Sequence, residues 1–168
     1  MANKNWFSNR VESEAVKDRL SYANRAQELI GILVSLLGLW FFLAHQWLST
    51  GFFTSKFGQT ATFLFYAPTL LDMFKTAVKA AFGRKNIVRP LDIVHMGLSF
   101  VSVVWLYRVF PFDFSHLADV LPVFLRFLLQ WVSNGIARVF MVVAMIVTPI
   151  AAAYNVVLYV FVRWELKS

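Results

Sequence analysis

Charged and titratable side chains recur at intervals of three and four residues inside two otherwise apolar stretches of this chain. In the first stretch they are Asp72, Lys75 and Lys79. The second stretch carries a set with similar spacing: Asp92, His95, Ser99 and Ser102. On a helix, such spacing places each set along one face. An imidazole titrates near neutral pH and carboxylates attract cations, so two facing sets would form a polar track that passes protons or cations.

A basic turn from Gly83 to Pro90 separates the two sets, so the stretches are expected to fold as an antiparallel hairpin. A rise of about 1.5 Å per residue then sets which side chains lie level. The expected neighbours are Lys79 with Asp92, Lys75 with His95, and Asp72 with Ser99. The alternative interpretation is structural: an ion pair between Lys79 and Asp92 holds the hairpin together, while Lys75 extends toward water.

Asp92 and His95 also have the spacing of two metal ligands on one helix. A third and fourth ligand would have to come from Asp72 or from another copy of the chain, so no metal ion and no cofactor is expected. An intramembrane hydrolase could pair Ser99 or Ser102 with His95, since Ser99 lies four residues away on the same face. Serines in apolar helices, however, usually hydrogen-bond to their own helix or to a neighbouring one. Nucleotide-binding loops and hydrolase motifs are missing from the sequence. We therefore expect a protein that is not an enzyme.

The elements that carry these residues are strongly apolar. Of the 168 residues, 59% are hydrophobic, 15% are charged and none is cysteine. A soluble domain has roughly 45–50% apolar and about 25% charged residues, so this chain lacks the polar residues to cover a soluble globule. The net charge is +7, but the cationic residues flank apolar runs, so no nucleic-acid partner is expected. The composition predicts an integral membrane protein in contact with the lipid bilayer.

Four apolar stretches are long enough to cross a bilayer, which takes about 20 residues. They run over 29–48, 61–82, 91–110 and 139–162. A polar helix over 9–28 is expected to continue into the first of them. The chain is therefore predicted to be all-α, a bundle of four transmembrane helices that forms a single transmembrane domain over 1–168.

The basic residues predict which ends of these spans face the cytoplasm. With four spans, the N-terminus, the basic turn and the C-terminus share one side of the membrane. That side holds every Lys and Arg except Lys56, Arg108, Arg126 and Arg138. Because positive charge favours the cytoplasmic side, both termini of this multi-pass chain are predicted to be cytoplasmic.

The segment 114–132 decides between four spans and five. Plotted as a helix, its polar residues, Asp119 and Arg126 among them, fall on one side. That pattern predicts an amphipathic helix that lies in the outer interface or re-enters the bilayer partway. A fifth span and a pore loop lining a water path are the alternatives. His45 and His116 belong to the same outer side, where both are expected to be solvated.

Small and polar residues mark the faces on which the spans can pack. Gly31, Ser35 and Gly38 lie along one side of the first span, a pattern that allows close approach of another helix. In the last span, Asn155 needs a hydrogen-bond partner, expected to be a serine of the third span or another copy of the chain.

Two functional hypotheses follow from these patterns. The first is a homo-oligomeric ion or proton channel whose polar track uses Asp72, Asp92 and His95. Four helices enclose little volume, so such a path would need several copies of the chain. The second is a non-catalytic accessory or assembly subunit, which binds other membrane subunits through its small-residue faces and its basic surface.

Overall fold

The computed structural model describes residues 20–84 and 87–165 and is built from four long helices. They are α2 (Tyr22–Trp47), α3 (Gln59–Phe82), α4 (Arg89–Val109) and α5 (Asn134–Glu165). Two short 3-10 helices, η1 (Phe114–His116) and η2 (Val123–Leu128), lie between α4 and α5. Within these residues there is no β-strand, which confirms the all-α prediction.

Local sequence signals explain where the helices begin and end. Ser21 caps α2, because its hydroxyl accepts a hydrogen bond of 3.2 Å from the backbone N–H of Asn24. Gly83 ends α3 in the left-handed conformation, which glycine adopts without strain. Residues 22–28 form the first turns of α2, so the predicted polar helix does continue into the first apolar stretch there. Its part over 9–19 lies outside the described residues.

Three of the four helices are long and apolar enough to cross a membrane: α2, α4 and the part of α5 over Asn134–Val162. The helix α3 has 24 residues, which is long enough, but no stretch of it is as apolar as those of the other three helices. Its charged side chains, Asp72, Lys75 and Lys79, explain the difference. The structure therefore supports a membrane protein with three helices that could span the bilayer, and the crossing of the bilayer by α3 stays a prediction.

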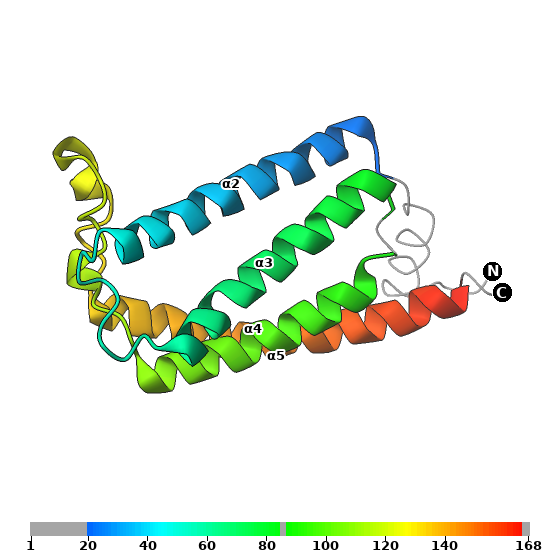
Figure 1. Ribbon diagram of the computed structural model, residues 1–168. Coiled ribbons are helices and arrows are strands. Elements are labelled where there is room, and N and C mark those ends of the chain that lie inside the picture. The colour runs from blue at the N-terminus through cyan, green and yellow to red at the C-terminus, as the bar shows by residue number, and fades with distance from the viewer. Residues whose placement is uncertain (1–19, 85–86, 166–168) are drawn as a thin grey trace.

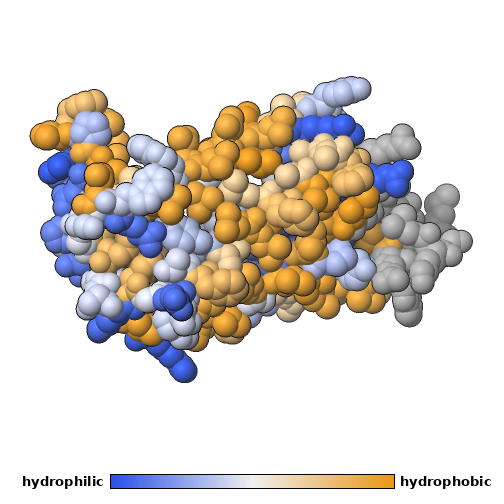
Figure 2. Space-filling model, in the orientation of Figure 1, coloured by the Kyte–Doolittle hydropathy of each residue, from blue (hydrophilic) through white to orange (hydrophobic). Residues whose placement is uncertain are grey.

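The helices form an open row and not a closed bundle. Each long helix packs on its neighbour in sequence, α2 on α3, α3 on α4 and α4 on α5 (Figure 1). In the described part of the chain, the backbone of α2 meets neither α4 nor α5. Few residues of the three apolar spans are buried within the chain: 11% for α2, 11% for α4 and 6% for α5. Apolar side chains cover much of the visible helical surface, while hydrophilic residues gather toward the two ends of the long helices (Figure 2).

The segment 114–132 is not the single amphipathic helix that its pattern predicts. It contains only the three residues of η1 and the six residues of η2 as helix, separated by a turn. Pro122 immediately precedes η2, and a proline has no N–H to continue an earlier helix. The segment lies at one end of the long helices, beside the end of α2 (Figure 1), and its re-entry into a bilayer stays a prediction.

A group of phenylalanine side chains packs together at this same end of the helices. We call it the aromatic cap, and its members are Phe41, Phe42, Phe52, Phe53, Phe57, Phe65, Phe112 and Phe114. Phe52 is only 1% exposed and packs with Leu106, Phe112 and Leu117. Backbone hydrogen bonds fasten its loop to the residues that follow α4: Asp113 N–H donates to the Phe52 carbonyl at 2.7 Å. The loop between α2 and α3 is therefore part of the core.

Candidate functional site

Lys75 is the centre of a charged cluster between α3 and α4. Its ammonium nitrogen lies 3.0 Å from a carboxylate oxygen of Asp72 and 2.9 Å from one of Asp92. The same nitrogen lies 3.3 Å from Nδ1 of His95, and Nε2 of His95 lies 3.3 Å from the hydroxyl of Ser99. A neutral imidazole satisfies both contacts, because Nδ1 can accept from Lys75 while Nε2–H donates to Ser99. The five side chains form one continuous hydrogen-bonded chain.

The predicted register of the α3–α4 hairpin is partly correct. Lys75 does lie beside His95, as predicted. The predicted ion pair between Lys79 and Asp92 is wrong, since Asp92 pairs with Lys75 and Lys79 pairs with Glu28. Glu28 belongs to α2, and the row of helices places α2 against α3, which gives Lys79 a partner that the hairpin alone does not contain.

The small residues of α2 have no helix packed closely against them in this chain. At Gly31 and Gly38, a Cβ atom would meet nothing within 4 Å. Together with Ser35 they form one wall of a groove between α2 and α3. In the described residues, the close helix contact that the small-residue pattern allows is therefore not made within one chain.

Asn155 finds its partners on α5 and α4. Its amide nitrogen donates to the Ala151 carbonyl at 2.8 Å and lies 3.8 Å from the sulfur of Met96. The expected bond to Ser99 or Ser102 is not the one observed. Ser102 is 3% exposed, and its hydroxyl has no hydrogen-bond partner.

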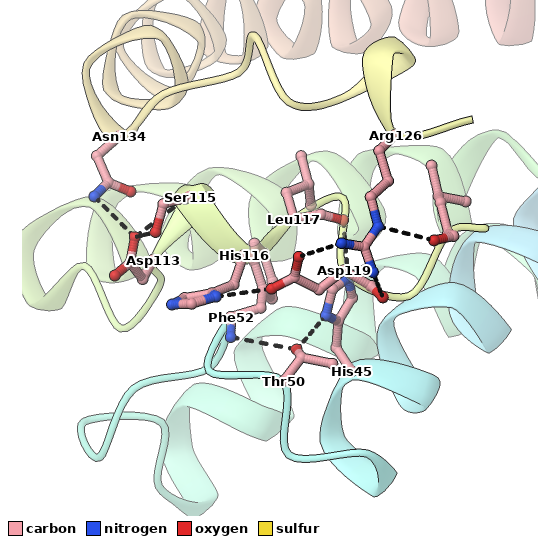
Figure 3. A network of polar contacts seen from close by, with 11 residues as sticks. His45, Thr50, Phe52, Asp113, Ser115, His116, Leu117, Asp119, Arg126 and Asn134 are labelled. Atoms are coloured by element: carbon pink, nitrogen blue, oxygen red, sulfur yellow. Dashed lines mark hydrogen bonds and ion pairs between the residues drawn. The ribbon is translucent and has the colours of Figure 1, made fainter. Parts of the chain in front are cut away.

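A second polar network lies beside the aromatic cap, at the end of the long helices where α2 ends (Figure 3). Its centre is His45 of α2, which is 1% exposed. Nε2 of His45 donates to the Leu117 carbonyl at 3.1 Å, and Nδ1 lies 2.5 Å from the Thr50 hydroxyl. His45 was expected to be solvated, and this is wrong because the segment containing Leu117 folds over the end of α2. The sequence offers no signal of that burial.

Asp119 and Arg126 are brought together by the turn that replaces the predicted helix. A carboxylate oxygen of Asp119 lies 2.8 Å from Nδ1 of His116, and another lies 3.8 Å from the Arg126 guanidinium. Arg126 also donates to the Leu121 carbonyl at 3.2 Å. These contacts hold the turn in shape. Because the three side chains are partly exposed, their polar atoms remain accessible to water.

Asp113 holds the first residues of this segment, and we expect it to make stability depend on pH. Its carboxylate accepts hydrogen bonds from the Ser115 hydroxyl at 2.7 Å and the Ser115 N–H at 3.1 Å, which lowers the pKa of Asp113 from its usual value of 3.8. A carboxyl group whose pKa is lower in the folded state than in the unfolded state stabilises the fold at pH values above its unfolded-state pKa. That stabilisation is lost as the pH falls through the folded-state pKa. The stability difference between the wild type and Asp113→Asn should therefore be largest above about pH 5 and shrink below about pH 3.

Unfolding of both proteins in mild detergent, followed by circular dichroism across this pH range, measures the Asp113 effect. A difference that stays constant down to the lowest pH would contradict it. The effect should be small, since the carboxylate is largely solvated.

Neither cluster forms a metal centre in the described residues, where no three His, Asp or Glu side chains gather around one point. At the first cluster, the ammonium of Lys75 occupies the position between the two carboxylates. No protein family model matches the sequence, and neither a curated protein nor a solved structure matches the chain. The two polar clusters and the exposed faces of the helices are therefore the features that indicate a function.

Proposed function

We propose that this protein transports protons or cations as a homo-oligomer in a membrane, with the Lys75 cluster as part of the path. The observation that carries the proposal is the hydrogen-bonded chain from Asp72 and Asp92 through Lys75 and His95 to Ser99. Ionisable groups inside a bilayer are costly, so a cluster of them in an apolar helix pair is a candidate for function.

The chemistry of the cluster favours proton transfer over the passage of hydrated ions. His95 is placed to accept a proton at Nδ1 from the Lys75 side and to release one at Nε2 toward Ser99. The carboxylates balance the charge of Lys75 and can each hold a proton in turn. Ser102 lies one turn beyond Ser99 on α4 and has a buried hydroxyl with no partner, which extends the polar path.

The length of the path supports an oligomer. From Asp92 to Ser102 the polar residues cover about 15 Å along α4, roughly half of the 30 Å of hydrocarbon. The other half would have to be formed with further copies of the chain, for which the open row leaves helical faces free. We also propose that the α3–α4 turn and both termini face the cytoplasm, since these regions are rich in Lys and Arg.

Purified protein in liposomes with an internal pH indicator tests this proposal. A pH gradient should collapse faster with the wild type than with empty liposomes, and His95→Ala and Asp72→Asn should each lower the rate at least tenfold. Lys56→Met is the matched control, because it changes an exposed lysine outside the cluster and should leave the rate unchanged. A rate equal to that of empty liposomes, or one that neither cluster variant alters, would refute the proposal.

A second candidate function is that of an accessory subunit in a larger membrane complex. The observation that favours it is the exposure of α5, of which only 6% of the apolar span is buried in this chain. Isolation from native membranes in mild detergent separates the two candidates. An accessory subunit should co-purify with other membrane proteins in fixed proportion, whereas recovery of homo-oligomers alone favours transport.

A further inference from the structure

The groove between α2 and α3 contains a cavity of about 500 Å³, whose wall includes the start of α4. One end of this cavity is lined by Glu28, in the first turns of α2, and by Val88 at the α3–α4 turn. The other end is lined by Ser35 and Asp72, which lie near the middle of α2 and α3. From Glu28 to Ser35 the cavity follows α2 for about 10 Å. The cavity therefore leads from the turn end of the helices to a point near their middle.

Five ionisable side chains line the cavity, and their ion pairs leave each of them partly exposed. Lys79 pairs with Glu28, while Lys75 lies between Asp72 and Asp92. The exposed fraction of these side chains ranges from 15% for Lys75 to 40% for Asp72. Three carboxylates and two ammonium groups share the wall, so with all five groups ionised it carries one net negative charge. The wall is therefore polar, partly accessible and anionic.

Such a wall favours water over hydrocarbon as the content of the cavity. Ionisable side chains within a membrane almost always face the interior of a bundle or a water-filled space. Lipid acyl chains neither donate nor accept hydrogen bonds, so carboxylates and ammonium groups exposed to them would lose their hydration without replacement. One water molecule takes about 30 Å³, so the cavity can hold several in contact with one another. A continuous column of water therefore has room to extend from Glu28 to Asp72.

We propose that this cavity is a water-filled vestibule, through which protons and small hydrophilic cations reach the Lys75 cluster from the side of the α3–α4 turn. They enter past Glu28 and Lys79 and reach Asp72 without crossing hydrocarbon. The net negative charge of the wall raises the local concentration of cations and lowers that of anions. The role of the vestibule as an entrance rests on the proposed function, whereas its water content and its preference for cations do not depend on transport.

Cysteine labelling tests the vestibule, because the chain contains no cysteine of its own. Ser35→Cys and Thr76→Cys each place one thiol in the wall of the cavity. Gly97→Cys is the matched control, since Gly97 lies near the middle of α4, is exposed and lies outside the cavity. Each variant is reconstituted in liposomes and treated with a membrane-impermeant cationic methanethiosulfonate. This reagent reacts with the thiolate and therefore needs a thiol in contact with water.

The two wall positions should be labelled rapidly and from one side of the membrane. Ser35→Cys and Thr76→Cys should react at least tenfold faster than Gly97→Cys. When one orientation of insertion is in excess, their labelled fraction should match that of a cysteine marker at the turn and not that of a marker at the opposite end. Two exposed residues provide these markers, Arg84→Cys at the turn and Lys56→Cys at the opposite end.

The charge of the wall is tested with a second, anionic reagent of similar size. After each rate is divided by the rate with a free thiol in solution, the cationic reagent should react several-fold faster at Ser35→Cys. Asp72→Asn, which removes one negative charge from the wall, should reduce this ratio. Equal corrected rates with the two reagents would overturn the preference for cations.

Rates at both wall positions as slow as that at Gly97→Cys would overturn the vestibule. If oxidation then joined the same cysteines into disulfide-linked dimers, a second copy of the chain would be the occupant of the cavity instead. Rapid labelling of a protein that collapses no pH gradient would refute transport and leave the vestibule in place, so the two proposals can fail separately. Circular dichroism shows whether each variant is folded, and either wall position alone suffices.

Discussion

Replacing Lys75 with methionine should lower the free energy of unfolding by about 3 kcal/mol. Methionine has a similar length, so the change removes the charge and leaves the apolar part of the side chain largely in place. Asp72 and Asp92 then lose the cation that lies 3.0 Å and 2.9 Å from them, and two carboxylates face each other in an apolar region. Removing one partner of a buried ion pair costs more than the pair contributes, because the remaining charges stay uncompensated.

A rescue variant can show why the Lys75→Met protein loses stability. If unpaired carboxylates cause the loss, then adding Asp72→Asn and Asp92→Asn to Lys75→Met should restore most of the stability. Lys56→Met, at an exposed loop lysine, should change it by less than about 0.5 kcal/mol. Unfolding in bicelles or mild detergent, followed by tryptophan fluorescence, measures all three. A triple variant as unstable as the single one would show that Lys75 acts by packing and not by charge compensation.

Replacing His45 with alanine should cost a similar amount, about 3 kcal/mol, for a different reason. The imidazole is buried against the rings of Phe41 and Phe52, with centroids 4.8 Å and 4.9 Å away. Alanine leaves a cavity there and deprives the Leu117 carbonyl of its donor. The damage should be local, so hydrogen exchange should accelerate in residues 49–58 and 112–121 while the middle of α5 remains protected.

His116→Ala is the natural control for His45→Ala. His116 is a second histidine of the same network, but 44% of its side chain is exposed and its partner is a partly exposed carboxylate. Its loss should cost less than about 1 kcal/mol. If the two alanine variants proved equally stable, the buried hydrogen bonds of His45 would not hold the aromatic cap to α2.

Local patterns were sufficient to predict the helices and part of the candidate site. Apolar runs of about 20 residues and the signals at their ends, such as Gly83 after α3, depend only on nearby residues. The placement of Lys75 beside His95 was also predictable, because a short turn and a regular helical rise restrict the register of a hairpin. One helical turn from Lys75, the predicted partner of Lys79 was wrong, because Glu28 of α2, a helix outside the hairpin, pairs with it instead.

The sequence by itself determined that this is an all-α chain with apolar spans and with charged residues grouped on two faces. Periodicity and hydropathy are properties of each helix alone, which is why they can be read from the sequence. Only the tertiary structure decided that the helices form an open row, that His45 is buried and that a groove separates parts of α2 and α3. Each of these features depends on contacts between residues distant in the sequence, and no local pattern encodes which surfaces will meet.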